Sequence, residues 1–348
     1  MMKFKLKSIA ALLSVLFFGL QVFAGGLEEF KKEYHETFDV NKDVILTVSN
    51  KFGFVKIVTS ETDQINIDVK VTVEAKNAEK AKKLLDEIQI EIIGNKENVS
   101  AITKLAKGSK FKELSIDYTI TMPVSGNVDI TNKFGSFYLN ELNGNSKIYV
   151  GYGSLDVGSL NSQNNDVTVK FGSGKVKYAQ YLNYVSRYSS VHIDRAKLLN
   201  LDTQYGDARV GEVGRMDLKN AYGDVRLGTI VELKADVQFG DLDVEGIISL
   251  LELESQYGDV DIDFISKDFT EVIVHSAFGD VGLAFQSGSN FELHGKASFG
   301  EINIPGGTVS RVDGSGNADT YNGKLFEGTS PSKVTAKMSY GDLDISIH

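Results

Sequence analysis

The residues with the greatest chemical potential are carboxylates that recur at one position of a repeated pattern. Each follows an aromatic residue and a glycine, and the set is Asp207, Asp224, Asp241, Asp259, Asp280, Glu301 and Asp342. A second set stands where the pattern reads Gly-Asp-x-Asp: Asp243, Asp261 and Asp344. Clustered hard oxygen ligands of this kind suit Ca²⁺.

Stacked copies of the pattern would bring these carboxylates together. In-register stacking places neighbouring carboxylates roughly 5 Å apart, where like charges repel. Splaying into water, hydrogen bonds to turn amides, the nearby Arg209 and Arg226, or a bound cation would each offset that repulsion. The glycine-rich nonapeptide of calcium-binding β-rolls is absent, so turn capping by aspartate is the favoured interpretation and Ca²⁺ is the alternative. The candidate metal ligands in that alternative are Asp224, Asp241, Asp259 and Asp261.

Other reactive constellations are sparse. The chain has no cysteine to complete a zinc site, and metal-ligand spacing is missing among its histidines, which are His35, His192, His275, His294 and His348. It also has no nucleophile elbow, phosphate loop or dinucleotide fingerprint. A polysaccharide lyase or hydrolase would need an acid–base pair in one groove, and the nearest pairs are Asp207 with Arg209 and Asp224 with Arg226. Because these residues read as alternating outward-facing positions, we expect no catalytic residues, no cofactor and no enzymatic activity.

The elements that would position these residues are copies of one repeat that continues after Pro123 to the C-terminus. An aromatic residue recurs about every 20 residues, a period in the range of solenoid repeats. The aromatic positions are Phe134, Tyr152, Phe171, Tyr188, Tyr205, Tyr222, Phe239, Tyr257, Phe278, Phe299, Tyr321 and Tyr340. Two copies match less well, because Ser189 follows Tyr188 and Asn322 follows Tyr321. A related Phe52-Gly53 stands alone nearer the N-terminus.

Each copy contains two short strands joined at the glycine. Apolar residues such as Ala208 and Val210 stand three and five places after the aromatic residue, and Leu201 stands four places before it. Glycine suits the bend because a Cβ would resist a sharp turn or a positive φ. We expect hydrogen-bonded ladders between copies from the polar residues two places before the aromatic, namely Thr203, Asn220, Ser255 and Ser276.

This period predicts a parallel β-solenoid. A unit of about 20 residues cannot bury a core alone, so each copy must pack against its neighbours. A β-propeller blade needs about 40 residues, and the leucine-rich-repeat pattern is missing. An antiparallel sandwich would not require constant identity at the bend. The prediction is a mainly β chain with a parallel β-solenoid, or β-helix, of about 12 short rungs over residues 125–348.

Residues 25–124 are expected to form a different, β-rich module. Ile65–Val73 alternates apolar and polar residues, which indicates a strand with one buried face. Between Asn77 and Ile88 the apolar residues take helical spacing, and Asn77 is placed to cap the helix. We therefore expect one short helix across a small sheet, with a solvated, lysine-rich outer face.

The N-terminus predicts export. Three lysines within the first seven residues precede an apolar run from Ile9 to Leu20, and Val22 and Ala24 suit a signal peptidase. Residues 1–24 are therefore expected to be a cleaved signal peptide, since the run is shorter than the roughly 20 residues of a spanning helix. The expected location is the periplasm, the cell surface or the medium. A net charge of −10 argues against nucleic acid as a partner, because phosphate binding needs a basic footprint.

The signal segment, the strand-and-helix module and the Tyr/Phe-Gly-Asp-apolar repeats together resemble the bacterial putative adhesin family of β-solenoid domains, a domain family of unknown function. The similarity covers nearly all of the chain after residue 24. It implies the solenoid fold, and it brings no catalytic residues, because the family has none to transfer. Its name is an inference from architecture, so it adds little to a functional claim.

Two hypotheses about function follow. The first is an exported, adhesin-like structural or interaction protein of the cell envelope, without catalytic activity, whose partner is an unidentified envelope protein or glycan. Self-association through the solenoid end is part of this hypothesis, because the last repeat ends close to His348 and leaves an open edge. The alternative is a polysaccharide-binding or polysaccharide-cleaving β-helix protein that acts on acidic glycans.

Overall fold

The structure, a computed structural model, describes residues 27–305, 309–313, 318–325 and 332–348. Its described part is dominated by strands, with one helix, and divides into two compact units between Gly144 and Asn145. The predicted signal peptide lies outside the described residues. Within the described ranges no helix has the length and apolar character to span a membrane.

Unit 1, which ends at Gly144, consists of nine strands and the helix in its described part. They are β1 (Glu28–Asp39), β2 (Ile45–Phe52), β3 (Val55–Ser60), β4 (Gln64–Ala75), α1 (Ala78–Asp86), β5 (Ile88–Gly94), β6 (Asn98–Leu105), β7 (Leu114–Pro123), β8 (Asn127–Phe134) and β9 (Phe137–Leu142). Hydrogen bonds join them into two arrays, β1-β4-β7-β3-β9 and β5-β6-β2-β8.

The predicted strand and helix of the N-terminal module are confirmed. In β4 the apolar residues from Ile65 to Val73 are at most 1% exposed and alternate with polar ones, so one face of the strand is buried. Helix α1 begins after Asn77, whose side chain accepts a hydrogen bond from the Lys80 amide at 3.0 Å. Its buried face carries Ala81 and Leu85, which pack toward the sheet.

The first turns of the repeat already lie inside unit 1. Strands β2 and β8 pair in parallel with Phe52 opposite Phe134, and the two rings stack with centroids 5.2 Å apart. Strands β3 and β9, which follow those turns, pair in the same register. The expectation that Phe52-Gly53 stands alone is therefore wrong, because its partner belongs to a rung that comes much later in the chain, after β7, and no local pattern reveals this.

Unit 2, from Asn145 onward, contains the remaining strands. They are β10 (Ser146–Tyr152), β11 (Ser154–Leu160), β12 (Asn165–Lys170), β13 (Ser173–Arg187), β14 (Ser190–Gln204), β15 (Ala208–Ala221), β16 (Val225–Gln238), β17 (Leu242–Gln256), β18 (Val260–Ile265), β19 (Glu271–Ala277), β20 (Val281–Phe285), β21 (Phe291–Ser298), β22 (Ile302–Asn303), β23 (Val309–Asp313), β24 (Ala318–Leu325), β25 (Lys333–Ser339) and β26 (Leu343–Ile347).

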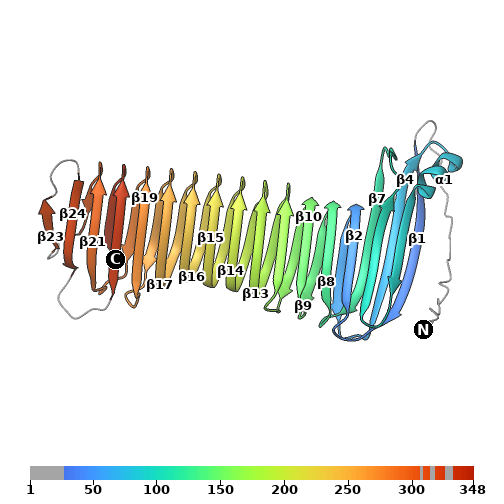
Figure 1. Cartoon of the computed structure of the whole chain (residues 1–348), viewed down its shortest axis with the longest axis horizontal. Helices are drawn as coiled ribbons and strands as arrows, with labels where there is room; N and C mark the ends of the chain where they lie inside the picture. The colour runs from blue at the N-terminus through green and yellow to red at the C-terminus, as the bar shows by residue number, and fades with distance from the viewer. Residues whose placement is uncertain (1–26, 306–308, 314–317, 326–331) are drawn as a thin grey trace, which may run out of the picture. The chain divides into compact units, whose positions relative to one another are not determined.

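These strands form the predicted parallel solenoid. Strands β13 to β17 lie side by side (Figure 1), and each pairs with the next at the repeat spacing, as Val210 does with Leu227. Both halves of a rung bury alternate residues, so Val210 and Leu218 of β15 are each at most 2% exposed. Every rung therefore covers the apolar residues of its neighbours.

The turn that ends each rung depends on the aromatic residue. Its backbone lies in the left-handed region, with φ between 53° and 61°, at Phe171, Tyr188, Tyr205, Tyr222, Phe239, Tyr257, Phe278, Phe299 and Tyr340. The expectation that glycine takes the positive φ is therefore wrong in these rungs. In unit 1 it holds, since Gly53 has a φ of 96°. A non-glycine residue in this region costs about 1–2 kcal/mol.

Ring stacking offsets that cost. Ten rings form one column in the order Tyr152, Phe171, Tyr188, Tyr205, Tyr222, Phe239, Tyr257, Phe278, Tyr340 and Phe299. Neighbouring centroids are 4.7 to 5.1 Å apart and the ring planes differ by at most 8°. Each such pair contributes about 0.5–1.5 kcal/mol beyond its buried area, which is comparable to the backbone strain of one turn.

Glycine is needed after the aromatic residue because successive turns approach closely. A Cβ added to Gly240 would lie well inside van der Waals contact with the carbonyl oxygen of Gly223. The same overlap with the preceding turn occurs at Gly206, Gly223, Gly258, Gly279, Gly300 and Gly341. Ser189 replaces glycine in one turn, where it is buried and its Oγ accepts a hydrogen bond from the Gly172 amide at 3.1 Å.

The polar residues before the aromatic do not form the predicted ladder. Thr203 and Ser276 are buried, and each donates from its hydroxyl to the carbonyl oxygen three residues later in its own rung, at 3.3 and 3.4 Å. Asn220 likewise donates to Gly223, whereas Ser255 is buried without a hydrogen-bond partner. These side chains cap their own turn, because its carbonyl is nearer than the side chain of the next rung.

The C-terminal rung is not the end of the solenoid. Strand β25 lies between β19 and β21, and β26 lies between β20 and β22, all parallel. Tyr340 accordingly stacks between Phe278 and Phe299. The expected open edge at the last repeat is therefore wrong. Beyond β21 the described chain continues as the antiparallel strands β24 and β23, and Tyr321 lies in β24 outside the aromatic column.

Replacing Gly240 by alanine should destabilise the protein by about 1–3 kcal/mol, because the new methyl group overlaps a backbone carbonyl that cannot move without breaking the register. Gly246→Ala is the matched control, since its Cβ would find its nearest neighbour at 3.6 Å. Urea unfolding midpoints measure both variants. Equal midpoints for Gly240→Ala and the wild type would contradict the close-approach argument.

Deleting residues 332–348 should leave β19 and β21 without the strand that joins them and expose unpaired strand edges. We expect a lower unfolding midpoint and a shift to larger species in light scattering. A truncated chain that stays monomeric and keeps its midpoint would show that the inserted rung contributes nothing to stability.

Candidate binding face

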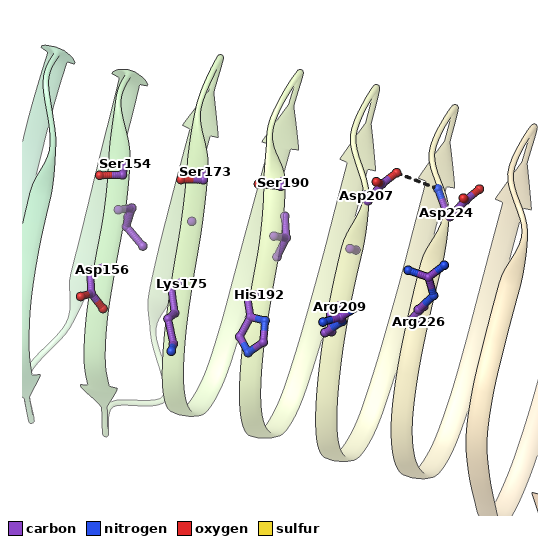
Figure 2. Close-up of a pocket in the computed structure, with 14 residues that line it drawn as sticks. Ser154, Asp156, Ser173, Lys175, Ser190, His192, Asp207, Arg209, Asp224 and Arg226 are labelled. Carbon is purple, nitrogen blue, oxygen red and sulfur yellow. Dashed lines mark hydrogen bonds between the residues drawn. The ribbon is translucent and has the colours of Figure 1, made fainter.

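One outward face of unit 2 collects most of the polar residues singled out in the sequence. It is formed by the first half of each rung, from β11 to β18, and alternate residues there point outward because their neighbours, such as Ala208 and Val210, are buried. Two columns run across the rungs (Figure 2). The turn column is Ser154, Ser173, Ser190, Asp207, Asp224, Asp241 and Asp259, and the charged row is Asp156, Lys175, His192, Arg209, Arg226, Asp243 and Asp261. Each member of the charged row is the register partner of the next.

The carboxylates of the turn column are bound to backbone amides of the next rung. Asp207 Oδ1 accepts from the Asp224 amide at 3.2 Å, and Asp224 Oδ1 accepts from the Asp241 amide at 3.3 Å. The ladder continues through Asp259, Asp280, Asp342 and Glu301 with distances of 2.8 to 3.0 Å. Each aspartate therefore caps the turn of the next rung. The backbone amide that it binds stabilises the negative charge of the carboxylate.

The calcium interpretation separates into two parts. Asp224, Asp241 and Asp259 lie in the amide ladder, whereas Asp261 lies in the charged row. Within the ranges that the structure describes, no group of three or more acidic or histidine side chains is close enough to hold a metal ion. A calcium site on this face stays a prediction.

The charged row has a basic half that sequence reasoning identified only in part, because it named Arg209, Arg226 and His192 but not Lys175 and did not recognise a row. Lys175, His192, Arg209 and Arg226 stand at the same offset, four places after their aromatic residues, and this shared offset is the signal that would have found them. His192 contacts Asp194 at 2.7 Å, and Arg226 contacts Asp243 at 3.2 Å. Among the described residues, Lys175 and Arg209 have no ion-pair partner. A shallow groove runs along this half of the row (Figure 2).

The candidate acid–base pairs do not pair with each other. Asp207 and Arg209 share the face, as do Asp224 and Arg226, but Arg226 binds Asp243 of the next rung and both aspartates accept backbone amides. The histidines are dispersed: His35 binds Asp68 in unit 1, and His294 contacts Asn322 near the end of unit 2. The face can therefore hold charged or hydroxylated groups in a regular array, and the carboxylates of its turn column are bound to backbone amides.

The other half of the row is acidic, and Asp261 has no ion-pair partner among the described residues. Burial, followed by the charges of Asp243, Asp263, Asp259 and Asp241, raises the pKa of Asp261 above its usual value. Register explains the crowding, because Asp243 and Asp261 are direct partners on β17 and β18. The sign of charge along this face thus changes between Arg226 and Asp243.

Comparison with known proteins fits this architecture. The model of the Toastrack DUF4097 family matches residues 46–346, which include almost every rung. The chain belongs to the Toastrack DUF4097 family. The match begins within β2, so it includes the Phe52 turn of unit 1 together with the repeats of unit 2. This family membership accounts for the fold and assigns no activity.

Solved structures similar to this Toastrack chain share little sequence with it. A putative adhesin from Bacteroides fragilis is 12% identical, covering 90% of this chain and 97% of that one, with a TM-score of 0.27. A putative adhesin from Parabacteroides merdae is 10% identical over 90% and 96%, with a TM-score of 0.31. A putative lipid binding protein from Parabacteroides distasonis is 10% identical over 90% and 96%, with a TM-score of 0.26. Comparison with curated proteins gives no match.

Replacing Asp261 by asparagine should stabilise the protein at neutral pH. The raised pKa means that the folded state disfavours ionisation, so the stability associated with Asp261 is complete below pH 3.8 and is lost as the pH rises through the folded pKa. The variant should therefore have the higher thermal midpoint at neutral pH, and the difference should close in acid. Asp156→Asn, opposite Lys175, is the control that should not gain stability. A lower neutral-pH midpoint for Asp261→Asn would contradict this account.

Proposed function

We propose that this Toastrack protein is exported and acts in the cell envelope as an adhesin-like interaction protein without catalytic activity. The partner in this proposal is an envelope glycan or protein bound along the candidate binding face. The N-terminal sequence, with its lysines and short apolar run, supports export to the periplasm, the cell surface or the medium.

One observation supports the proposal best: the basic half of the charged row. Lys175 and Arg209 are exposed cations without partners in the described chain, and they are set two rungs apart in a groove with serine hydroxyls at its edge. Parallel strands repeat at about 4.8 Å, so these groups match a ligand that itself repeats, such as an extended glycan or a strand-like protein segment. A single small substrate would leave most of the array unused.

The hydrogen bonds between the turn-column aspartates and the amides of the next rung support the non-catalytic part of the proposal. Carboxylates that would act as acid or base at Asp207 and Asp224 already accept hydrogen bonds from backbone amides. Releasing either one for chemistry would break a hydrogen bond between two rungs, which contributes about 0.5–1.5 kcal/mol. These carboxylates are therefore better suited to holding rungs together than to proton transfer.

Self-association remains part of the proposal, at a different place from the one first expected. The C-terminal rung is enclosed between its neighbours, so it offers no free edge. Strand β23 pairs with β24 and with no other described strand, so its outer side is one strand edge that a second copy could pair with.

Changing Lys175 and Arg209 together to glutamine should weaken binding to acidic glycans by about tenfold, because each exposed charge contributes roughly 0.2–1 kcal/mol. The matched control is the pair Arg215→Gln and Lys219→Gln, which removes the same charges from the other half of the rung. Calorimetry of the purified chain against uronate and neutral glycans measures both.

The same glycan panel tests the catalytic alternative. Incubation followed by analysis of released oligosaccharides should show no cleavage. Turnover that disappears in Asp224→Asn would establish an enzyme and end the non-catalytic proposal. Equal glycan affinity for the Lys175/Arg209 variant and the wild type would remove the binding role of the face.

A further inference from the structure

Unit 1 contains a concentration of positive charge that the proposed face does not include. Five lysines line one open hollow of about 1200 Å³: Lys51, Lys107, Lys110, Lys112 and Lys133. Glu113 is the single carboxylate among the residues that line it, in a chain whose net charge is −10. Within the described residues none of the five lysines has an ion-pair partner.

The lysines come from three separate segments that the fold brings together. Lys51 and Lys133 immediately precede Phe52 and Phe134, which are register partners on the parallel strands β2 and β8. Lys107, Lys110 and Lys112 lie on the loop between β6 and β7. Hydrogen bonds hold that loop, with the Ala106 amide bound to the Glu87 carbonyl at 2.9 Å and Ser109 Oγ bound to the Ala106 carbonyl at 2.8 Å.

This placement is unfavourable unless an anion is present. Residues at the same position of adjacent parallel strands are about 5 Å apart, where like charges destabilise each other. Some exposed lysines elsewhere in unit 1 are paired, as Lys83 is with Glu79 and Lys104 is with Glu91. The hollow lacks such pairs among its described residues, so a bound polyanion would relieve its repulsion.

The walls of the hollow indicate what kind of anion fits. Phe52, Phe111 and Leu114 add apolar surface between the lysines. Lysine is a compact charge on a flexible stem, which suits a ligand with several anionic groups rather than one planar group gripped by a fork. The volume far exceeds that of a single ion, and a concave surface admits a chain more readily than a flat bilayer. An oligosaccharide with a carboxylate on each sugar has both the repeated charge and the apolar C–H faces.

We propose that the five-lysine hollow of unit 1 is a binding site for an acidic oligosaccharide. The inference rests on the proposed role as an interaction protein, and it places a ligand on a different surface from the candidate binding face. Lys107, Lys110 and Lys112 supply charge from the loop, Lys51 and Lys133 supply it from the strands, and the phenylalanines contact the sugar rings.

Calorimetry of the full chain with an oligogalacturonate tests the site. The triple variant Lys107→Gln, Lys110→Gln and Lys112→Gln should bind about tenfold more weakly, because three exposed charges are removed without disturbing a strand. The matched control is Lys76→Gln, Lys80→Gln and Lys82→Gln, which removes the same charge from exposed positions at helix α1 and should bind as the wild type does. The methyl ester of the oligogalacturonate, which is the same sugar without charge, should not bind.

Four results would overturn the inference. The first two are no binding of oligogalacturonate, and equal affinity of the loop variant and the wild type for it. The other two are equal affinity of the wild type for oligogalacturonate and its methyl ester, and loop-dependent binding to phosphatidylglycerol vesicles without oligosaccharide binding. The Lys175/Arg209 variant separates this site from the candidate binding face. If only the Lys175/Arg209 variant loses oligogalacturonate binding, the candidate binding face is supported and the hollow is not the site. If only the loop variant loses it, the hollow is supported and the face is not the site.

Discussion

The spacing between turns is the constraint on which unit 2 depends. At most turns the carbonyl oxygen of one rung occupies the space that a Cβ would need in the next, so residues such as Gly223 and Gly240 cannot carry a side chain without a shift of the backbone. That approach sets the aromatic rings within stacking distance, and the stacking offsets the left-handed backbone conformation of nine of the ten stacked residues. The strained backbone of each turn thus persists because the contacts between rungs compensate for its energy.

The same spacing decides what the polar residues do. Because identical positions lie about 4.8 Å apart, outward-facing side chains of neighbouring rungs lie close to their counterparts. The aspartates of the turn column accept a hydrogen bond from the amide of the next turn, as Asp224 does from Asp241. The charged row contains both positive and negative residues, and its side chains are exposed to solvent. The result is a surface organised in columns, where Arg226 bonds across rungs to Asp243 rather than within its own. In the function that we propose, this surface would bind an extended partner.

Several features were predictable because short sequence patterns, some of them repeated along the chain, specify them. The Tyr/Phe-Gly-Asp period predicts parallel rungs, and the alternation in β4 and the cap at Asn77 predict a strand and a helix. The basic row is equally visible in the sequence, as a constant offset from the aromatic residue. The five-lysine hollow was not visible, because register pairing between distant strands brings Lys51 beside Lys133, and the loop that carries Lys110 lines the same hollow from another part of the chain.

The repeat alone is enough to predict that this chain stacks short β units, since a repeat of about 20 residues buries its apolar positions only against copies of itself. The order of those copies, and which residue of the turn has the strained backbone, became known from the folded chain. Tyr340 and Tyr321 carry similar motifs, yet the first enters the column between Phe278 and Phe299 and the second lies in an antiparallel strand. Because the rungs share one motif, the repeat does not specify which rungs become neighbours. The packing of whole rungs against each other determines their order.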